Sequence, residues 1–311
     1  MKGLEFIATG RALGSKVVTN DDFAKVLDTS DEWIFSRTGI HERHICQDQT
    51  NLDLAVEAGR QAMERAGISP QDVGLCVVAT FSPDFCTPAT ACLVQKRLGL
   101  PTEIASFDMN GACTGFLYAL HVARGLLLQQ ERPYGLVIGS ELISRVLDFT
   151  DRSTCVLFGD GAGAAVVRLA DKAYTCCLGS SGDEEMIWAH GPGKEVAAVH
   201  MNGSAVYRFA VETVPRTALE VLDKAGLTLE DVDWFVPHQA NRRIVEAAAR
   251  RLKTPLDKWY LNMEHYGNMS AATIPIAIDE MDQKGLLKRG QKLLLLGFGA
   301  GLTWGGTLLE W

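Results

Sequence analysis

A single thiol surrounded by small residues is the feature of this sequence best suited to covalent chemistry. Cys113 lies in the run N-G-A-C-T-G-F at 110–116, and an apolar run that favours a helix follows from Phe116 to Leu120. At a helix start, unpaired backbone N–H groups and the helix dipole favour a thiolate. Because small neighbours leave room for a bulky group, we predict that Cys113 is a nucleophile that accepts an acyl group. The alternative is a buried structural cysteine.

Three other segments carry polar or flexible residues where chemistry is often placed. His238 directly follows a short apolar run that predicts a buried strand, and a histidine at a strand end can exchange protons near neutral pH. Asn268 lies in the turn-like run Y-G-N-M-S, and the glycine-rich segment 297–301 could direct backbone N–H groups at a ligand oxygen. Taken alone, each has a plainer interpretation: a loop histidine, a helix N-cap and an ordinary turn.

Internal similarities in the sequence predict how these residues are brought together. Segments 66–73 and 225–232 each have the pattern of a helix that ends at glycine, a short turn and then a buried strand. The turn at Cys113 and the turn at 267–272 each lead into a helix, and the glycine-rich segments 158–167 and 297–306 both resemble hairpins. Three similarities in one order predict duplicated halves, 1–170 and 171–311.

Apolar runs indicate the fold class. Segments 75–79, 136–139 and 293–296 are apolar throughout, which is typical of strands in sheets covered by helices on both faces. They alternate with helical patterns, and no long linker separates the halves. We therefore predict an α/β protein whose halves pack as one body.

The bulk composition limits the classes of partner. The chain has 311 residues, 47% of them hydrophobic, and a net charge of −8, which disfavours nucleic-acid binding. Its eight cysteines form no C-x-x-C motif and mostly lie in apolar patterns, so we expect free thiols in a reducing cytoplasm. No apolar run reaches the roughly 18 residues needed to cross a bilayer. We expect a cytoplasmic protein with no nucleic-acid or membrane partner.

Taken together, these motifs resemble the 3-oxoacyl-[acyl-carrier-protein] synthase III family. The matching runs are N-G-A-C-T-G-F around Cys113, V-P-H-Q-A-N around His238, Y-G-N-M-S-A-A around Asn268 and G-F-G-A-G-L-T-W-G from 297, with further matches at 31–34, 37–40 and 158–163. The resemblance covers nearly the whole chain in order. It implies the thiolase fold, in which two duplicated α/β halves form a layered α-β-α-β-α core.

The resemblance implies the initiating condensation of bacterial fatty-acid synthesis. Cys113 would take the acyl group of an acyl-CoA primer, and backbone N–H groups of Cys113 and Ala300 would hold the tetrahedral oxyanion. Malonyl-acyl carrier protein would then lose CO2, while His238 and Asn268 donate hydrogen bonds to the enolate oxygen. The carbanion would attack the acyl group and give 3-oxoacyl carrier protein. No metal or organic cofactor is expected, because the CoA thioester is itself the activated substrate.

The resemblance also implies contacts with CoA. Trp33 and Arg152 would sandwich the adenine, since a planar base stacks well between an indole and a guanidinium group. Arg37 would face the CoA phosphates. The full set implied to contact CoA is Thr29, Trp33, Arg37, Arg152, Gly203 and Asn241, of which Gly203 and Asn241 would line the pantetheine tunnel.

A basic helix pattern follows His238 and suits an acidic carrier protein. The segment 241–253 contains four arginines and one lysine against one glutamate. Positions 243, 247 and 250 share a helical face, which brings Arg243 and Arg250 together beside His238. We predict that Arg208, Arg243, Arg250 and Arg251 dock the carrier protein by charge complementarity. The alternative is an ordinary solvated helix face.

Three positions depart from the pattern of the family. Thr87 stands where acetyl-preferring members often have phenylalanine, which closes the acyl pocket of the partner subunit, and a smaller residue predicts longer or branched primers. The resemblance also implies a homodimer, because that pocket is built across a dimer interface. Met269 replaces a common threonine beside Asn268, with an effect that the sequence leaves open. Ala300 replaces a common glycine, which is harmless if its backbone torsion is ordinary.

Other functions stay open on the sequence alone. One is a related condensing or esterifying enzyme of secondary metabolism. A catalytically silent partner subunit would be expected to lack Cys113 or His238, and both are present. A cysteine hydrolase built on the same two residues fits less well, because Asn268 and a CoA tunnel have no role in it.

Overall fold

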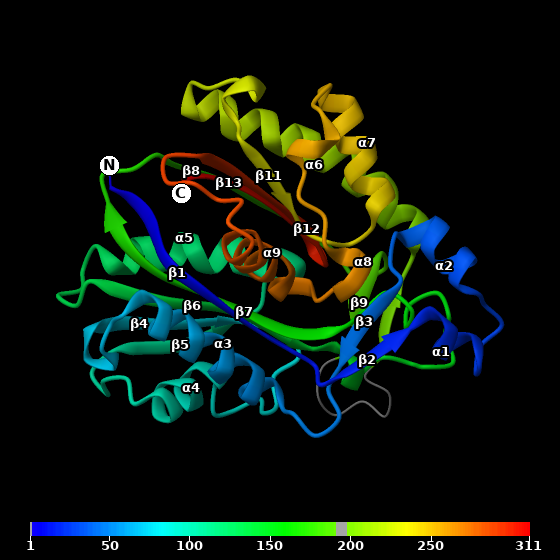
Figure 1. Ribbon diagram of the computed structural model, residues 1–311, viewed down its shortest axis with the longest axis horizontal. Coiled ribbons are helices and arrows are strands. Elements are labelled where there is room, and N and C mark those ends of the chain that lie inside the picture. Colours follow the sequence, from blue (N-terminus) through cyan, green and yellow to red (C-terminus); the bar gives the residue numbers. More distant parts are fainter. Residues whose placement is uncertain (1, 191–197) are drawn as a thin grey trace.

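The computed structural model describes residues 2–190 and 198–311, in which helices and strands alternate (Figure 1). The strands are β1 Gly3–Leu13, β2 Lys16–Thr19, β3 Glu42–Ile45, β4 Val73–Ala79, β5 Ala105–Met109, β6 Tyr134–Leu142, β7 Asp160–Ala170, β8 Tyr174–Asp183, β9 Ile187–Ala189, β10 Val199–Met201, β11 Trp234–Pro237, β12 Lys292–Gly299 and β13 Gly301–Glu310. The α-helices are α1 Asn20–Ala24, α2 Asp31–Thr38, α3 Asn51–Ala66, α4 Thr90–Leu98, α5 Gly115–Leu127, α6 Gly203–Ala225, α7 Arg242–Leu252, α8 Met263–Tyr266 and α9 Thr273–Gln283. Two 3-10 turns carry site residues, η2 Ala112–Thr114 and η6 Ser270–Ala272.

The two main sheets have the same strand order and directions. The first is β1-β7-β6-β4-β5, in which β4 runs parallel to both β5 and β6 while β7 runs antiparallel to both its neighbours. The second is β8-β13-β12-β11 with the same directions. An isolated parallel bridge between Phe235 and Trp259 takes the place of the β4–β5 pairing. The chain passes between the sheets at 171–173, and we propose 1–170 and 171–311 as the duplicated halves.

Five layers follow from this arrangement. Figure 1 shows α3 and α4 on the outer face of the first sheet, α5 and α9 between the sheets, and α6 and α7 on the outer face of the second. The middle layer has the largest buried cluster, with Val77, Leu117, Ile274 and Leu295 among its members. Each sheet is therefore covered on both faces, which explains why its central strands are apolar throughout. The predicted α-β-α-β-α arrangement is confirmed.

The glycine that ends each outer helix has a local cause. Helix α3 ends at Gly67 with φ +63°, and α6 ends at Gly226 with φ +67°. Both glycines have a left-handed backbone, which costs a residue with a Cβ but not glycine. A short 3-10 turn then leads into β4 or β11, as the repeated segments predicted.

One sequence expectation was wrong. The segment 158–167 is not a hairpin: its second part is the start of β7, which pairs with β1 on one side and β6 on the other. The equivalent segment 297–306 is a true hairpin of β12 and β13. The difference lies in the connection, because β6 reaches β7 through a long loop whereas Ala300 alone separates β12 from β13.

Two smaller observations complete the fold. All eight cysteines lie in the described part of the chain and are free, with Cys86 and Cys92 exposed. Among residues 2–190 and 198–311, no helix combines the length and the apolar character that crossing a membrane requires.

Candidate active site

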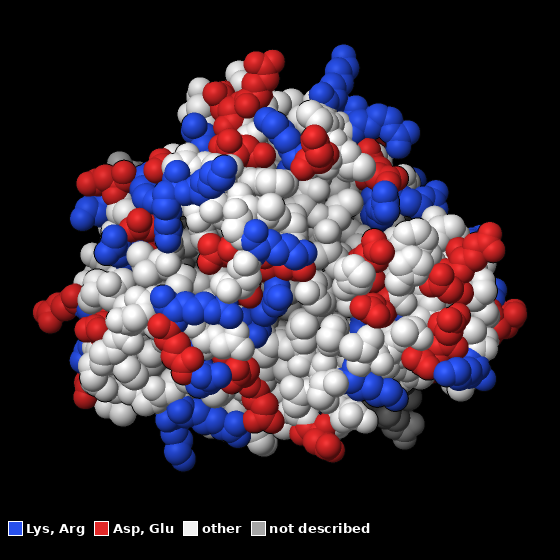
Figure 2. All heavy atoms as spheres, viewed as in Figure 1, with Lys and Arg blue, Asp and Glu red and all other residues white. Residues whose placement is uncertain are grey.

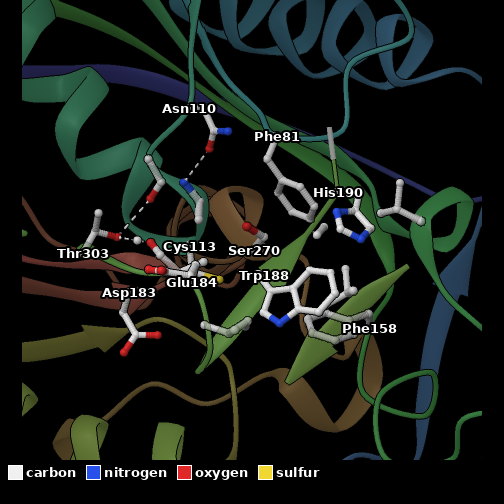
Figure 3. Close-up of a pocket in the computed structure, with 18 residues that line it drawn as sticks. Phe81, Asn110, Cys113, Phe158, Asp183, Glu184, Trp188, His190, Ser270 and Thr303 are labelled. Atoms are coloured by element: carbon white, nitrogen blue, oxygen red, sulfur yellow. Dashed lines mark hydrogen bonds between the residues drawn. The ribbon is translucent and has the colours of Figure 1, made fainter. Parts of the chain in front are cut away.

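Cys113 is held by a tight turn between β5 and α5. Asn110 Oδ1 accepts a hydrogen bond of 3.1 Å from the N–H of Ala112, whose φ is +44° (Figure 3). Cys113 itself is 8% exposed. The facing residue must be glycine, because a Cβ on Gly299 would lie 2.8 Å from the Cβ of Cys113. The small residues near Cys113 thus allow close packing of the hairpin end against the sulfur.

The same backbone turn occurs at Asn268 in the second half. Asn268 Oδ1 accepts a hydrogen bond of 2.9 Å from the N–H of Ser270, whose φ is +46°. Asn268 therefore uses its carbonyl oxygen within the turn, which leaves the Nδ2 amide as a hydrogen-bond donor. Asn110 and Asn268 occupy equivalent positions of the two halves, one leading into α5 and the other into α9.

His238 follows β11 and is 2% exposed. Its Nδ1 lies 2.7 Å from the hydroxyl oxygen of Thr273, which also lies 2.8 Å from the carbonyl oxygen of Ser270. The hydroxyl has one proton. It donates that proton either to this carbonyl, with the imidazole proton on Nδ1, or to Nδ1, with the imidazole proton on Nε2.

Cys113 lies where two cavities meet. The smaller, of about 100 Å³, is lined by Cys113, His238 and Asn268 and by the predicted tunnel residues Gly203 and Asn241. The larger, of about 570 Å³, lies on the other side of the sulfur and falls in the usual size range of ligand pockets. Figure 3 shows its lining, which includes Phe81, Phe158, Trp188, Ser270 and Thr303. The structure thus brings the three predicted catalytic side chains to one cavity.

Ala300 also lines the larger cavity beside Cys113. The residue of the hairpin turn with a positive φ is Gly301, at +134°, and Ala300 has no positive φ. Alanine is therefore unstrained at this position. The Ala300 N–H donates to no backbone carbonyl in the described part of the chain, and it is available to a ligand oxygen.

Burial determines the charge of the site. It raises the pKa of the Cys113 thiol to about 12. The predicted thiolate is therefore wrong for the ligand-free protein, since desolvation outweighs the effect of the helix start. Burial also lowers the pKa of His238 to about 3 and raises that of Glu141 to about 7. Cys113 and His238 are both neutral at pH 7.

The sequence analysis missed three polar residues around the site. Ser270 lines the larger cavity, Thr273 holds the His238 ring, and Glu141 is a fully buried carboxyl group on β6. The sequence held a signal for two of them. Ser270 follows Asn268 by two residues, as Ala112 follows Asn110, and both have a positive φ. Glu141 is an acidic residue in a strand whose other central residues are buried.

The residues predicted to bind the CoA nucleotide lie together around α2. The guanidinium carbons of Arg37 and Arg152 lie 4.5 and 5.1 Å from the centroid of the Trp33 ring. Arg152 also forms an ion pair with Asp28. A base between Trp33 and Arg152 needs a separation of about 7 Å, twice the van der Waals distance. The Arg152 side chain would therefore have to move outward for adenine to enter.

Asn241 links the smaller cavity to α2, which carries Trp33 and Arg37. Its Nδ2 donates a hydrogen bond of 2.9 Å to the carbonyl oxygen of Arg37, and this contact places α2 beside the start of α7. Thr29, just before α2, has a buried hydroxyl with no hydrogen-bond partner among the described atoms. Because this oxygen is closed off from solvent, neighbouring side chains would have to move before a ligand could reach it.

The predicted docking arginines lie on α6 and α7. Arg208, Arg243, Arg250 and Arg251 are all exposed, and within residues 2–190 and 198–311 none forms a salt bridge. Arg243 lies over the Tyr207 ring, which also lines the tunnel, at 5.8 Å. Figure 2 shows Lys and Arg side chains projecting where Figure 1 places α7, with Asp and Glu side chains between them.

Thr87 and Met269 lie apart from the cavities of their own chain. Thr87 is exposed on the loop between β4 and α4 and lines neither cavity. Met269 is 1% exposed and packs with Ala272 and Ile276. A Cβ on Gly161 would lie 2.5 Å from the Met269 sulfur, so the side chain fills a core space rather than the site. Among the described residues, no group of three His, Cys, Asp or Glu side chains could hold a metal ion.

Comparisons with known proteins agree with this geometry. Two family models match, 3-oxoacyl-[acyl-carrier-protein] synthase III over residues 107–182 and its C-terminal region over residues 222–311. A beta-ketoacyl-[acyl-carrier-protein] synthase III of Clostridium acetobutylicum is 46% identical, covering 100% of this chain and 99% of that protein. The crystal structure of the synthase III of Aquifex aeolicus has a TM-score of 0.95 and 42% identity, covering 99% of this chain and 100% of that one.

A further solved structure extends the comparison. The priming beta-ketosynthase of the R1128 polyketide biosynthetic pathway has a TM-score of 0.91 and 34% identity, covering 99% of this chain and 96% of that one. The fold and the site together define a condensing enzyme of the thiolase fold. The chain belongs to the 3-oxoacyl-[acyl-carrier-protein] synthase III family, and it is an acyltransferase. The predicted family, fold class and enzyme class are confirmed.

Proposed function

We propose that the enzyme transfers an acyl group from acyl-CoA to Cys113 and then condenses it with malonyl-acyl carrier protein. The products are 3-oxoacyl carrier protein, CoA and CO2. One observation carries the proposal: a buried thiol lies between a narrow passage lined by His238 and Asn268 and a larger cavity that can hold an acyl chain. The thioester activates its own carbonyl, so we propose that no metal or organic cofactor takes part.

Acyl transfer is the first half-reaction. The Cys113 sulfur attacks the thioester carbonyl, and backbone N–H groups of Cys113 and Ala300 stabilise the oxyanion that forms. Ala300 supports this role because it lies beside Cys113 and its N–H is available. CoA then leaves and the acyl group remains on the sulfur.

Decarboxylation and condensation follow in the same cavity. Loss of CO2 from the malonyl group puts negative charge on the thioester oxygen, which needs hydrogen-bond donors. Asn268 supplies Nδ2, because its Oδ1 is used within the turn. His238 supplies Nε2–H in the tautomer in which the Thr273 hydroxyl donates to Nδ1. Both donors are neutral at pH 7. The carbanion then attacks the acyl carbonyl on Cys113.

CoA and the carrier-protein arm would reach Cys113 by the same route. We propose that the pantetheine chain passes Gly203 and Asn241, which line the smaller cavity. The nucleotide would lie on Trp33, Arg37 and Arg152, with Thr29 donating its hydroxyl proton. The hydrogen bond from Asn241 to Arg37 supports this route, because it joins the passage to the nucleotide surface.

Reversing one charge on α7 is expected to weaken carrier-protein docking. Arg250→Glu places a carboxylate against an acidic partner, and like charges across an interface are unfavourable. We expect the KM for malonyl carrier protein to rise about tenfold, equivalent to about 1.4 kcal/mol, with a smaller change in kcat. Lys288→Glu, an exposed lysine after α9, is the matched control. Equal effects of the two variants would rule out docking at α7.

The larger cavity favours acyl chains beyond acetyl. Its lining includes Phe81, Val146, Phe158, Ile187 and Val199, and each methylene buried on such walls contributes about 0.8 kcal/mol, or about fourfold in affinity. We expect kcat/KM to be higher with isobutyryl- or octanoyl-CoA than with acetyl-CoA. A strict preference of the wild-type enzyme for acetyl-CoA would contradict this.

Thr87 supports a homodimer of this enzyme. It lies exposed beside Phe85, which is 53% exposed, on a loop next to the edge strand β5. We propose that a second subunit covers this surface and that Thr87 reaches the acyl cavity of the partner. Thr87→Phe is then expected to shift preference toward acetyl-CoA. We also propose a cytoplasmic location, supported by eight free thiols.

A condensing enzyme of secondary metabolism is the second candidate. Its support is the 34% identity to a priming ketosynthase of a polyketide pathway. The two candidates share the chemistry and differ in the carrier protein that supplies the extender. A catalytically silent subunit is disfavoured, because Cys113, His238 and Asn268 line one cavity.

The proposed function is tested on the wild-type enzyme with defined substrates. Intact-mass spectrometry after incubation with a panel of acyl-CoAs should show one acyl group on Cys113. Adding malonyl-acyl carrier protein should release CO2 and give a 3-oxoacyl product. Free acid without CO2 would instead indicate a hydrolase, and the absence of any adduct would overturn the proposal. Carrier proteins of fatty-acid and polyketide synthesis, compared side by side, separate the two candidate pathways.

A further inference from the structure

Two buried polar atoms near the site have no hydrogen-bond partner among the described atoms. They are the hydroxyl oxygen of Ser270 and Oε1 of Glu141. Ser270 is 1% exposed and Glu141 is fully buried. Folded proteins rarely leave such groups unpaired, so a pair of them beside a nucleophile requires an explanation.

The backbone brings these two residues to the same place. Glu141 follows Gly139 by two positions on β6, so both side-chain positions are on one face of the strand. That face abuts η6, because a Cβ on Gly139 would lie 2.3 Å from the carbonyl oxygen of Ala271. Ser270 is the residue before Ala271, and it lines the larger cavity together with Cys113. Figure 3 shows Ser270 beside Cys113 in the wall of the larger cavity.

The carboxyl group of Glu141 is held in a fixed orientation. Its Oε2 accepts hydrogen bonds from the Ser82 hydroxyl at 2.5 Å, the Phe81 N–H at 3.2 Å and the Thr80 hydroxyl at 3.2 Å. All of these donors come from the segment after β4. Oε2 is therefore fully engaged, whereas Oε1 accepts no hydrogen bond from the described atoms.

The acyl-transfer step needs an acceptor for one proton. Cys113 is a neutral thiol before the reaction, so its S–H proton must leave as the sulfur attacks. His238 is a weak proton acceptor, because burial lowers the pKa of its imidazole to about 3. Glu141 is a fully buried carboxyl group on the face of β6 that abuts η6, and its Oε1 has no hydrogen-bond partner among the described atoms.

We propose that Glu141, acting through the Ser270 hydroxyl, accepts the proton of the Cys113 thiol during acyl transfer. The S–H bond breaks as the bond from sulfur to the acyl carbon forms. The thiol proton passes to Ser270 Oγ, and the hydroxyl proton of Ser270 passes to Oε1 of the Glu141 carboxylate. When the bond to CoA breaks, the departing thiolate takes up a proton and Glu141 releases its own. The inference rests on the proposed acyl transfer to Cys113.

The acceptor must be ionised for this step, which predicts a pH dependence. Thr80 and Ser82 from the segment after β4, Ser270 from η6 and the Cys113 thiol are the polar groups that face Glu141, and none is charged at pH 7. Burial raises the pKa of Glu141 to about 7. The carboxylate is lost as the pH falls below that value, so acylation should slow there. Neither Cys113 nor His238 titrates in this range.

The test measures acylation of Cys113 in a single turnover, from CoA release by octanoyl-CoA, between pH 5.5 and 9. The variants are Glu141→Gln, Ser270→Ala and the conservative Glu141→Asp. Alanine is acceptable at 270 because Ala112 has nearly the same backbone, with φ +44° against +46°. Thr9→Val is the matched control, since Thr9 is a fully buried hydroxyl that hydrogen-bonds Asp279 instead. Thermal unfolding of each variant reports on folding.

We expect acylation by Glu141→Gln and Ser270→Ala to be about 10²-fold slower, the lower range for loss of a general base. The rise in rate through about pH 7 should disappear in Glu141→Gln and return in Glu141→Asp. Wild-type rate and pH profile in folded Glu141→Gln or Ser270→Ala would overturn the inference. A wild-type enzyme that is not acylated at all would instead overturn the proposed function.

Discussion

Cys113→Ala is expected to abolish both acyl transfer and condensation. The sulfur is the atom to which the acyl group becomes attached, and alanine has no group that can replace it. Loss of a covalent nucleophile reduces kcat by about 10⁶-fold in a comparable case. Intact-mass spectrometry with octanoyl-CoA should detect no adduct on this variant, and no 3-oxoacyl carrier protein should form.

The control for this variant is another thiol. Cys92 is exposed on α4, and Cys92→Ala removes a sulfur without opening a buried cavity. It should acquire one acyl group at the wild-type rate. An adduct on Cys113→Ala would mean that a different residue accepts the acyl group, which contradicts the central role of this turn.

Asn268→Asp is expected to slow decarboxylation of malonyl carrier protein by about 10²–10³-fold. An aspartate oxygen can still accept the Ser270 N–H, so the turn is preserved. The second oxygen then replaces the Nδ2 donor and places negative charge beside the developing enolate. His238→Ala, which removes the other donor, should have an effect of similar size. CO2 release is the direct measurement.

Acylation of Cys113 separates this effect from damage to the fold. It does not require stabilisation of an enolate, so folded Asn268→Asp should lose much less acylation than decarboxylation. The reverse order would place Asn268 in the first half-reaction. Decarboxylation at the wild-type rate in either variant would remove that residue from the proposed oxyanion site.

The repeated pattern of helix end, short turn and buried strand could be predicted because it leaves local marks in the sequence. A glycine with positive φ must end α3 and α6, and an apolar strand must follow each. These constraints act within a few residues of one another and are therefore visible without coordinates.

The network behind the sulfur could not be predicted because it depends on burial. Glu141 and Ser270 come from different halves, and only packing of β6 against η6 brings them together. The charge of Cys113 has the same origin. The helix start favours a thiolate, but removal of the thiol from water has the larger effect, and the sequence does not report how deeply it is buried. The segment 158–167 was misread as a hairpin because glycine-rich turns and glycine-rich strands look alike in sequence.

The meeting of two cavities at one sulfur separates two kinds of specificity. Of the described lining residues, only Cys113, Phe158 and Ile187 border both. On the proposed assignment, the larger cavity selects the primer and the smaller one admits the carrier arm. Most residues that line one cavity do not line the other. The range of primers can therefore diverge among relatives while the partnership with the carrier protein is retained.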